Sequence, residues 1–332
     1  MGKRWYGFVR VTGHDTSLES KIDMCLAALG DSIMAGFALE GVDYDTGTGL
    51  LNISAINEYR GQSYAIGGDE GAVTVANFVQ HYNSNAKGAS LGYHSAELCY
   101  GTLCIDFIRY PSKDVLNAAF SCALAMNLNT ELDYLIQEMK SVDGVDYEND
   151  WKMITIQIGS NDQFASCVSP FKSEVTAEKW GSHVEAAIER IKTEIPHTVV
   201  NLLGVFEVSQ VYTITEGQAY CHSLLNISQA IINRVECSCF LGSDQDCKNM
   251  DALVGSYNQK LEAIYNKYKG NQNSTFAVAY TPANINILGF SVNILSNVDC
   301  FHPNGKAHAW IAKDYDANEE IYCPTEDDRI QI

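Results

Sequence analysis

The feature that most constrains the fold of this chain is a regular alternation of short apolar segments with longer amphipathic ones. The short segments, which predict strands, are Ile22–Leu29, Val115–Phe120, Met153–Ile158, Thr198–Phe206 and Thr275–Tyr280. The longer segments, which carry apolar residues at helical spacing, are Leu128–Lys140, Ala177–Thr193 and Met250–Lys269. Thr130 is the expected cap of the first helix. Strands that alternate with helices predict an α/β fold with a parallel sheet covered on both faces.

The whole chain, 1–332, is predicted to form one domain. No repeat and no Pro- or Gly-rich linker marks a boundary, and 46% hydrophobic residues can fill a large core. Residues 1–20 are interpreted as an N-terminal extension. The regions 38–114 and 207–249 fit the alternation poorly, so they are expected to be either insertions beside a site or insertions without a functional role.

The charge balance limits the kinds of partner that this chain can have. The 22 basic and 41 acidic residues give a net charge of −19, which repels nucleic acid phosphates and anionic headgroups. We therefore expect no nucleic acid partner. No stretch approaches the roughly 18 apolar residues of a spanning helix, so contact with a membrane or micelle is expected to be peripheral. A solvated acidic surface explains the charge without any partner.

Cysteine usage points to an oxidising compartment. The chain has eleven cysteines, many of them grouped, and disulfides are their simplest explanation. Zinc bound by Cys237, Cys239 and Cys247 is the less favoured alternative, because that spacing lacks the paired cysteines and histidines of a structural site. Sequons stand at Asn52, Asn226 and Asn273. Together these features predict a secreted, extracellular or lysosomal glycoprotein.

Three polar clusters follow predicted strands. They are Gly30-Asp31-Ser32, Gly159-Ser160-Asn161-Asp162 and Asp299-Cys300-Phe301-His302-Pro303-Asn304. Each has an ordinary explanation as a turn, a helix cap or a structural histidine. Because ligands gather beyond the carboxyl ends of parallel strands, the clusters are expected to meet at one edge. A serine, an amide and an Asp/His pair at one edge form the set that an acyl-transfer enzyme requires.

The order GDS, GxND, DxxH resembles that of the GDSL or SGNH hydrolases, and most closely their phospholipase B-like branch. The resemblance runs from about Leu26 to Trp310. The segments that carry it are ALGDSIMAG, NEYRGQSYAIGGDEG, LNAAF, DWKMITIQIGSND and DCFHPNGKAHAW. It implies a three-layer α/β/α sandwich with a flavodoxin-like sheet. It also implies hydrolysis of carboxylic esters, often those of phospholipids or lysophospholipids, with no metal and no cofactor.

Carried over by position, the resemblance assigns a role to each site residue. Ser32 would be the nucleophile, His302 the general base, and Asp299 the carboxylate that orients the imidazole. The oxyanion hole would use the side-chain amide of Asn161 and the backbone N–H of Ser32.

One position departs from the family pattern. The third oxyanion donor is normally the backbone N–H of a glycine, where this chain has Cys122. The replacement matters if that position needs a backbone conformation that favours glycine. Gly68 is the runner-up donor. The departure leaves two alternatives to a lipase open: a catalytically impaired protein that binds lipid or glycan, and a carbohydrate acetylesterase.

Overall fold

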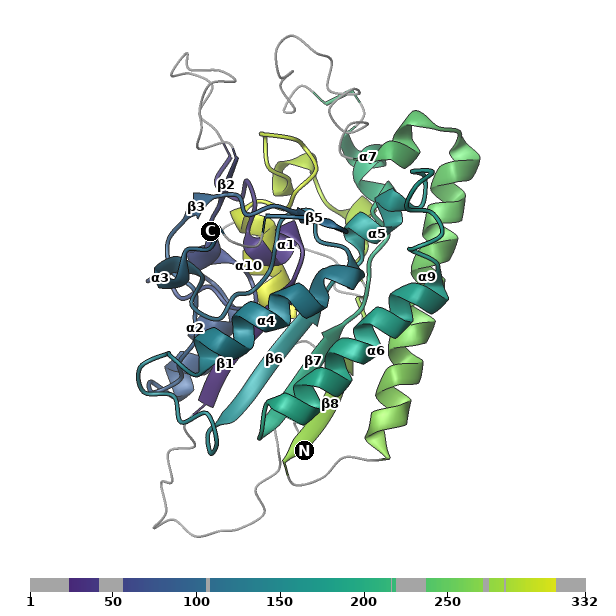
Figure 1. Cartoon of the computed structure of the whole chain (residues 1–332). Helices are drawn as coiled ribbons and strands as arrows, with labels where there is room; N and C mark the ends of the chain where they lie inside the picture. The colour runs from purple at the N-terminus through teal and green to yellow at the C-terminus, as the bar shows by residue number, and fades with distance from the viewer. Residues whose placement is uncertain are drawn as a thin grey trace, which may run out of the picture.

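A four-stranded parallel sheet in the order β1-β6-β7-β8 forms the centre of the molecule (Figure 1). The structure, a computed structural model, describes residues 24–41, 56–105, 108–215, 217–218, 237–270, 275–283 and 285–314. The strands are β1 (Met24–Gly30), β6 (Trp151–Gln157), β7 (Thr198–Leu203) and β8 (Phe276–Thr281). The parallel α/β sheet predicted from the sequence is confirmed.

Helices cover both faces of this sheet, which gives three layers (Figure 1). One layer holds α4 (Leu128–Met139), α6 (Ala177–Glu194) and α9 (Asp244–Lys269). The other holds α1 (Ser32–Ala35), α2 (Val75–Tyr82) and α10 (Gly305–Asp314). Alternate residues of β1 point to opposite faces: Cys25, Ala27 and Leu29 pack in the core under α4, α6 and α9, whereas Leu26 and Ala28 pack in the core under α1 and α10.

The remaining elements are short and lie mostly in the predicted insertions. Two antiparallel pairs join β2 (Asn57–Glu58) to β3 (His94–Ser95) and β4 (Cys99–Tyr100) to β5 (Leu103–Cys104). The short α-helices are α3 (Pro111–Asp114), α5 (Ser160–Ala165) and α7 (Ser209–Thr215). The 3₁₀ turns are η4 (Arg60–Gln62), η5 (Ala125–Asn127), η7 (Ser238–Leu241), η8 (Ile287–Gly289) and η9 (Val292–Ile294).

The prediction of a strand at Val115–Phe120 is wrong in detail. Val115 has a left-handed φ of 49°, and the residues after it run along the free edge of β1 without forming a regular ladder. The N–H of Ala28 donates to the Leu116 carbonyl, and the N–H of Phe120 donates to the Gly30 carbonyl. With this segment beside β1, the spatial order matches the flavodoxin-like order 2-1-3-4-5.

Two helix starts also differ from the predictions. Helix α4 begins at Leu128 after a 3₁₀ turn, with Asn127 as its N-cap, so Thr130 is not the cap. Helix α9 begins at Asp244 instead of Met250. The side chain of Ser243 and that of Asp246 form a capping box there, which supplies acceptors for N–H groups of the first turn.

Disulfides join Cys99 to Cys104 and Cys167 to Cys239, and Cys300 is also disulfide-bonded. Zinc binding by Cys237, Cys239 and Cys247 is therefore ruled out, because Cys239 has no thiolate to offer. The three sequons, Cys221, Cys323 and residues 1–20 lie outside the described residues. Within the described ranges, no helix has the length and apolar character needed to cross a membrane.

Three buried carboxyl groups lie beneath the carboxyl ends of β1 and β6. Glu131 accepts a hydrogen bond from the Gly30 N–H at 2.9 Å, Asp31 accepts one from Ile33, and Asp162 accepts one from Ala125. Burial raises the pKa of Asp31 to about 6 and that of Asp162 to about 8, and it raises the pKa of Glu131 well above its usual value. Ionising these groups therefore costs the folded state more than the unfolded state.

We expect these three carboxyl groups to lower the stability of the protein as the pH rises from about 4 to about 8. A carboxyl whose pKa is raised by folding stabilises the fold at pH values below its unfolded pKa, and this stabilisation is lost as the pH rises through the folded pKa. Asp162→Asn keeps an oxygen that can accept from Ala125 but cannot ionise. Its melting temperature should exceed that of the wild type by about 2 °C or more at pH 8, and the difference should become small only near pH 4, close to the unfolded pKa of an aspartate.

Thermal melts at both pH values check this, with Asp143→Asn as an exposed control that should follow the wild type. If Asp162→Asn loses as much stability as the wild type between the two pH values, the buried carboxyl is not the cause.

Candidate active site

The in-register pairing of β1 with β6 brings two of the polar clusters together. The last residue of β1, Gly30, pairs with the last residue of β6, Gln157. Ser32 therefore follows β1 at the same edge at which Asn161 follows β6. This is also the point at which the order of the strands reverses, between β1 and β6, where doubly wound sheets bind ligands.

Local sequence explains why Ser32 stands in the first turn of a short helix. Asp31 has an extended backbone, and its Oδ1 accepts from the Ile33 N–H at 3.0 Å, which is the geometry of an N-cap. Gly36 ends the helix with a left-handed φ of 74°. The N–H of Ser32 lies in the first turn, where backbone N–H groups have no acceptor within the helix.

A chain of two short hydrogen bonds links Ser32 to a carboxylate. The Oγ of Ser32 lies 2.7 Å from Nε2 of His302, and Nδ1 of His302 lies 2.6 Å from Oδ2 of Asp299. The other oxygen of Asp299 accepts from the N–H groups of Phe301 and His302. Burial opposes ionisation of Asp299, but the adjacent His302 and these hydrogen bonds lower its pKa below the usual value. Asp299 therefore carries a negative charge beside the imidazole.

Aromatic packing fixes the imidazole in this position. Phe37, just beyond α1, meets the His302 ring edge to face with centroids 4.8 Å apart, and Phe301 meets it at 5.4 Å. Ser32, Asp299 and His302 are all buried. The ring therefore keeps one orientation between the hydroxyl and the carboxylate.

The loop that contains Cys122 lies between Gly30 and Asn161. The N–H of Phe120 donates to the Gly30 carbonyl at 3.2 Å, and Nδ2 of Asn161 donates to the Ala123 carbonyl at 3.0 Å. The loop thus brings Cys122 to the edge where Ser32 and Asn161 stand. Cys122 has a left-handed φ of 68°, so the position does adopt the backbone conformation that favours glycine. An amide carries two N–H donors, so the contact with Ala123 leaves Asn161 one more.

The runner-up oxyanion donor has its hydrogen committed elsewhere. The N–H of Gly68 donates to the Ser90 carbonyl at 2.8 Å. An N–H in that bond cannot also be aimed at a reacting oxygen, which argues against Gly68 as an oxyanion donor.

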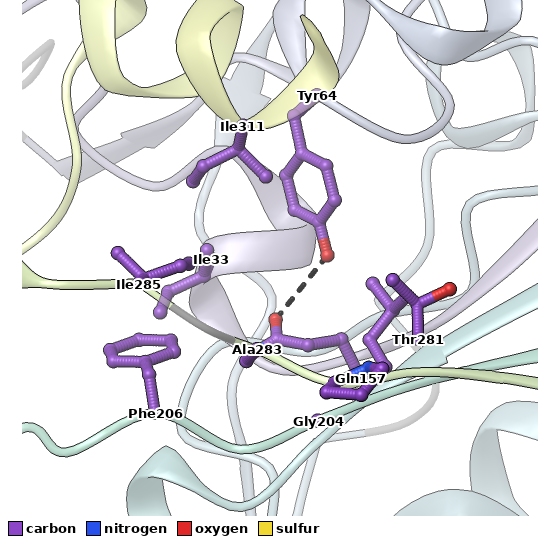
Figure 2. Close-up of a pocket in the computed structure, with 11 residues that line it drawn as sticks. Ile33, Tyr64, Gln157, Gly204, Phe206, Thr281, Ala283, Ile285 and Ile311 are labelled. Atoms are coloured by element: carbon purple, nitrogen blue, oxygen red, sulfur yellow. Dashed lines mark hydrogen bonds between the residues drawn. The ribbon is translucent and has the colours of Figure 1, made fainter. Parts of the chain in front are cut away.

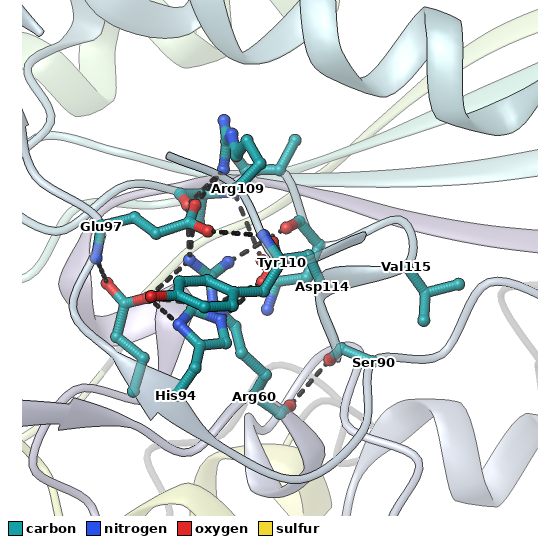
Figure 3. A network of polar contacts seen from close by, with 12 residues as sticks. Arg60, Ser90, His94, Glu97, Arg109, Tyr110, Asp114 and Val115 are labelled. Atoms are coloured by element: carbon teal, nitrogen blue, oxygen red, sulfur yellow. Dashed lines mark hydrogen bonds and ion pairs between the residues drawn. The ribbon is translucent and has the colours of Figure 1, made fainter. Parts of the chain in front are cut away.

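The structure also reveals a buried ionic cluster that the sequence analysis missed (Figure 3). Its members are Glu58, Arg60, His94, Glu97, Arg109 and Asp114. These residues come from four separate segments, so no sequence spacing could reveal the cluster. The segment NEYRG, which contains Glu58 and Arg60, could have drawn attention to the cluster, because it is part of a stretch that carries the family resemblance.

Three members of this cluster have the spacing of metal ligands. Ligand atoms of His94, Glu97 and Asp114 lie within 4.8 Å of one another. Arginine side chains already occupy the space: Nε of Arg60 lies 3.4 Å from Asp114, and Nη1 of Arg109 lies 2.7 Å from Glu97. Burial alone would raise the pKa of Asp114, but Arg60 and His94 lower it to about 2. Two guanidinium groups repel a cation, so this cluster is an ion-pair network instead of a metal site.

An apolar cavity of about 60 Å³ lies against Ile33 of α1 (Figure 2). Ile33 and Ile311 line it, together with Tyr64 and Gln157, whose Oη and Oε1 lie 3.5 Å apart. A second cavity of the same size is lined by Phe206, Phe301 and Pro303, among others. Ser32, His302 and Asn161 line neither of them. The polar groups that could react thus lie outside both cavities.

Comparison with known proteins gives matches over most of the chain. The family model of the GDSL-like lipase/acylhydrolases matches residues 26–315. Membrane-associated phospholipase B1 of Mus musculus is 27% identical over 310 residues, which cover 88% of this chain and 19% of the relative. Its counterpart in Homo sapiens is 25% identical over 332 residues, which cover 91% and 21%. The chain therefore spans about a fifth of the length of these curated relatives.

Two solved structures are similar over most of their length. A GDSL-like lipase described as putative, from Parabacteroides merdae, aligns with a TM-score of 0.46 and 12% identity, covering 90% of this chain and 97% of that one. An acetylxylan esterase from Geobacillus stearothermophilus aligns with a TM-score of 0.40 and 16% identity, covering 92% and 100%.

The family model extends over both the first cluster, Gly30-Asp31-Ser32, and the last, Asp299 to Asn304. The chain belongs to the GDSL-like lipase/acylhydrolase family, a family of carboxylic ester hydrolases.

Proposed function

We propose that this protein hydrolyses carboxylic esters through an acyl-enzyme on Ser32. The observation that carries the proposal is the unbroken chain from Ser32 Oγ through the His302 imidazole to the Asp299 carboxylate, at 2.7 and 2.6 Å. A serine hydroxyl is a weak nucleophile, and it becomes effective when an adjacent base accepts its proton.

In the first half of the reaction, His302 Nε2 takes the proton of Ser32 as Oγ attacks the ester carbonyl. The C–O bond to the alcohol then breaks, and His302 returns the proton to the leaving oxygen. In the second half, water attacks the acyl carbon while His302 takes a proton from it. The bond between the acyl carbon and Ser32 Oγ then breaks, His302 returns the proton to Oγ, and the carboxylic acid leaves. Asp299 stays ionised and stabilises the imidazolium that forms in each half.

The oxyanion that forms on the carbonyl needs donors aimed at it. We assign this role to the backbone N–H of Ser32, the backbone N–H of Cys122 and the side-chain amide of Asn161. Support comes from the hydrogen bonds that hold the Cys122 loop between Gly30 and Asn161.

The proposed substrates are phospholipids or lysophospholipids, reached by peripheral contact with a membrane or micelle. The names of the phospholipase B1 relatives support this choice. An exposed apolar rim also supports it: Leu98, Leu103, Ile105 and Ile108 are exposed, and Leu98 bridges to Ser121 beside Cys122. The net charge of −19 favours zwitterionic over anionic surfaces. The disulfides fit the extracellular or lysosomal location that we propose.

Ser32→Ala should abolish ester hydrolysis and leave the melting temperature nearly unchanged. Loss of the nucleophile costs several orders of magnitude in rate. The test is turnover of phosphatidylcholine, lysophosphatidylcholine and a short p-nitrophenyl ester, with covalent labelling by a fluorophosphonate. A wild type that neither turns over nor labels would indicate an impaired binding protein. Wild-type activity on acetylated sugars alone would indicate an acetylesterase.

Leu103→Ser should reduce activity on micellar lysophosphatidylcholine by roughly threefold or more and leave the rate on a soluble ester unchanged. Leu103 is 74% exposed, so its loss should not destabilise the fold, but it removes apolar surface from the rim. Tyr82→Ser is the control, because Tyr82 is 89% exposed at the end of α2, near the amino end of β1. Equal effects of the two variants would argue against a lipid-facing rim.

Cys122→Gly should keep kcat and leave the melting temperature unchanged or slightly higher. Glycine supplies the same backbone N–H, and it relieves the left-handed strain of a residue with a Cβ, which costs about 1–2 kcal/mol. Steady-state kinetics and thermal melts of the variant are the measurements. A clear fall in melting temperature would show that the thiol itself stabilises the loop, and a fall in kcat alone would show that it takes part in the reaction.

A further inference from the structure

The ionic cluster around Arg60 is built from fully buried charges. Nη2 of Arg60 lies 2.6 Å from Glu58 and 3.5 Å from Glu97, and Nε lies 3.4 Å from Asp114. The side chains of all four residues have no exposed surface. Figure 3 shows Arg60 among the acidic residues, with Arg109 on the far side of Glu97.

Stability alone does not explain such a cluster. Removing several charges from water costs more free energy than their mutual attraction usually returns, and apolar residues of similar volume often stabilise a core better. Charged groups can instead fix the positions of their neighbours, because the planar guanidinium of an arginine binds several acceptors at once in set directions. These groups therefore fix the backbone that they contact.

The cluster holds the segment that leads into Cys122. Arg60 donates to the carbonyls of Asn117 and Ala119, both at 3.0 Å. Arg109 donates to the carbonyls of Ala118, at 3.0 Å, and Ala119, at 3.3 Å. The two arginines thus hold three consecutive carbonyls of the segment that leads into Cys122.

The last residue before Cys122 is held from three directions. The hydroxyl of Ser121 donates to Oε1 of Glu58 at 2.6 Å, its N–H donates to the Glu97 carbonyl, and its carbonyl accepts from the Cys99 N–H at 3.0 Å. In a trans peptide the C=O and the following N–H point in opposite directions. The carbonyl faces Cys99, so the N–H of Cys122 points away from β4.

We propose that Glu58, itself held by Arg60, is a positioning residue for the oxyanion hole and acts through the hydroxyl of Ser121 to aim the backbone N–H of Cys122. The proposal rests on the proposed function, in which that N–H binds the oxyanion. In this proposal the ionic cluster contributes to the reaction as well as to the core, through the contact between Glu58 and Ser121.

Ser121→Ala isolates this contact with little disturbance. It removes the hydroxyl, while Oε1 of Glu58 keeps the N–H of Glu97 as a donor at 3.2 Å. The Cys122 N–H remains but is less firmly aimed. Loss of one oxyanion donor costs roughly 10²–10³ in kcat, so we expect a misaimed donor to lower kcat by about tenfold, with KM within about twofold of the wild type.

Ser90→Ala is the matched control. Ser90 is buried beside the ionic cluster but is not one of its members. Its hydroxyl donates to the Arg60 carbonyl at 2.7 Å and lies 3.4 Å from the Ile66 carbonyl, so it touches no atom of the Cys122 loop (Figure 3). Both variants lose one buried hydroxyl and one hydrogen bond, so their melting temperatures should fall by similar amounts. Ser90→Ala should keep the wild-type kcat. Ser121→Thr, which restores a hydroxyl, should recover most of the rate.

A second measurement distinguishes a misdirected Cys122 N–H from a general loss of activity caused by a less stable fold. A trifluoromethyl ketone forms a tetrahedral adduct with Ser32 and places an oxyanion in the hole. Its inhibition constant should rise in Ser121→Ala by the same factor as kcat falls, and it should stay unchanged in Ser90→Ala.

The results distinguish the two proposals. If the wild type has no Ser32-dependent turnover, the proposed function fails. If the wild type turns over but Ser121→Ala matches Ser90→Ala in kcat and in inhibitor binding, the positioning role of Glu58 is overturned and the proposed function stands. A fall in kcat without weaker inhibitor binding would also overturn it.

Discussion

The in-register parallel pairing of β1 with β6 is the constraint on which the rest of the site depends. Because Gly30 and Gln157 are direct partners, both chains leave the sheet at the same level, and the residues after them share one edge. A shift of this register would separate Ser32 from Asn161 and the Cys122 loop. Alternate residues of β1 pack in two different cores, so a shift of one residue would move each side chain into the opposite core, whose neighbours are different.

Around this edge the protein buries two sets of ionisable side chains. Asp31, Glu131 and Asp162 lie below the site, and the Arg60 cluster lies beside it. Both sets are costly to bury, yet they serve different ends. The carboxyls accept N–H groups of the loops that follow strands, whereas the arginines bind carbonyls along the open edge of β1. Burying these groups lowers the stability of the fold, but their hydrogen bonds hold the loops around the site in one geometry.

Segments with strong periodicity were predicted correctly from the sequence. Met153–Ile158 and Thr198–Phe206 form β6 and β7, and Ala177–Thr193 forms α6, because burial on both faces or along one stripe leaves a clear pattern. Val115–Phe120 was predicted to be a strand because a short apolar run is typical of one. In the structure, the carbonyls of Asn117 and Ala118 bind arginine side chains instead of forming a regular ladder. Helix α9 was predicted too short because its first turn is polar and is fixed by the Ser243 capping box.

The sequence by itself determined the family and most of the order of the elements. It also pointed to Ser32, Asn161, Asp299 and His302 as the site residues that we propose, because each stands in a short motif of neighbouring residues. It also identified Cys122 as a departure from the pattern. Only the tertiary structure decided that Cys122 adopts a left-handed conformation, that Cys167 pairs with Cys239, and that Glu58 and Arg60 reach the loop before Cys122. Those facts depend on contacts between segments far apart in the chain, and the amino-acid spacing carries no record of such contacts.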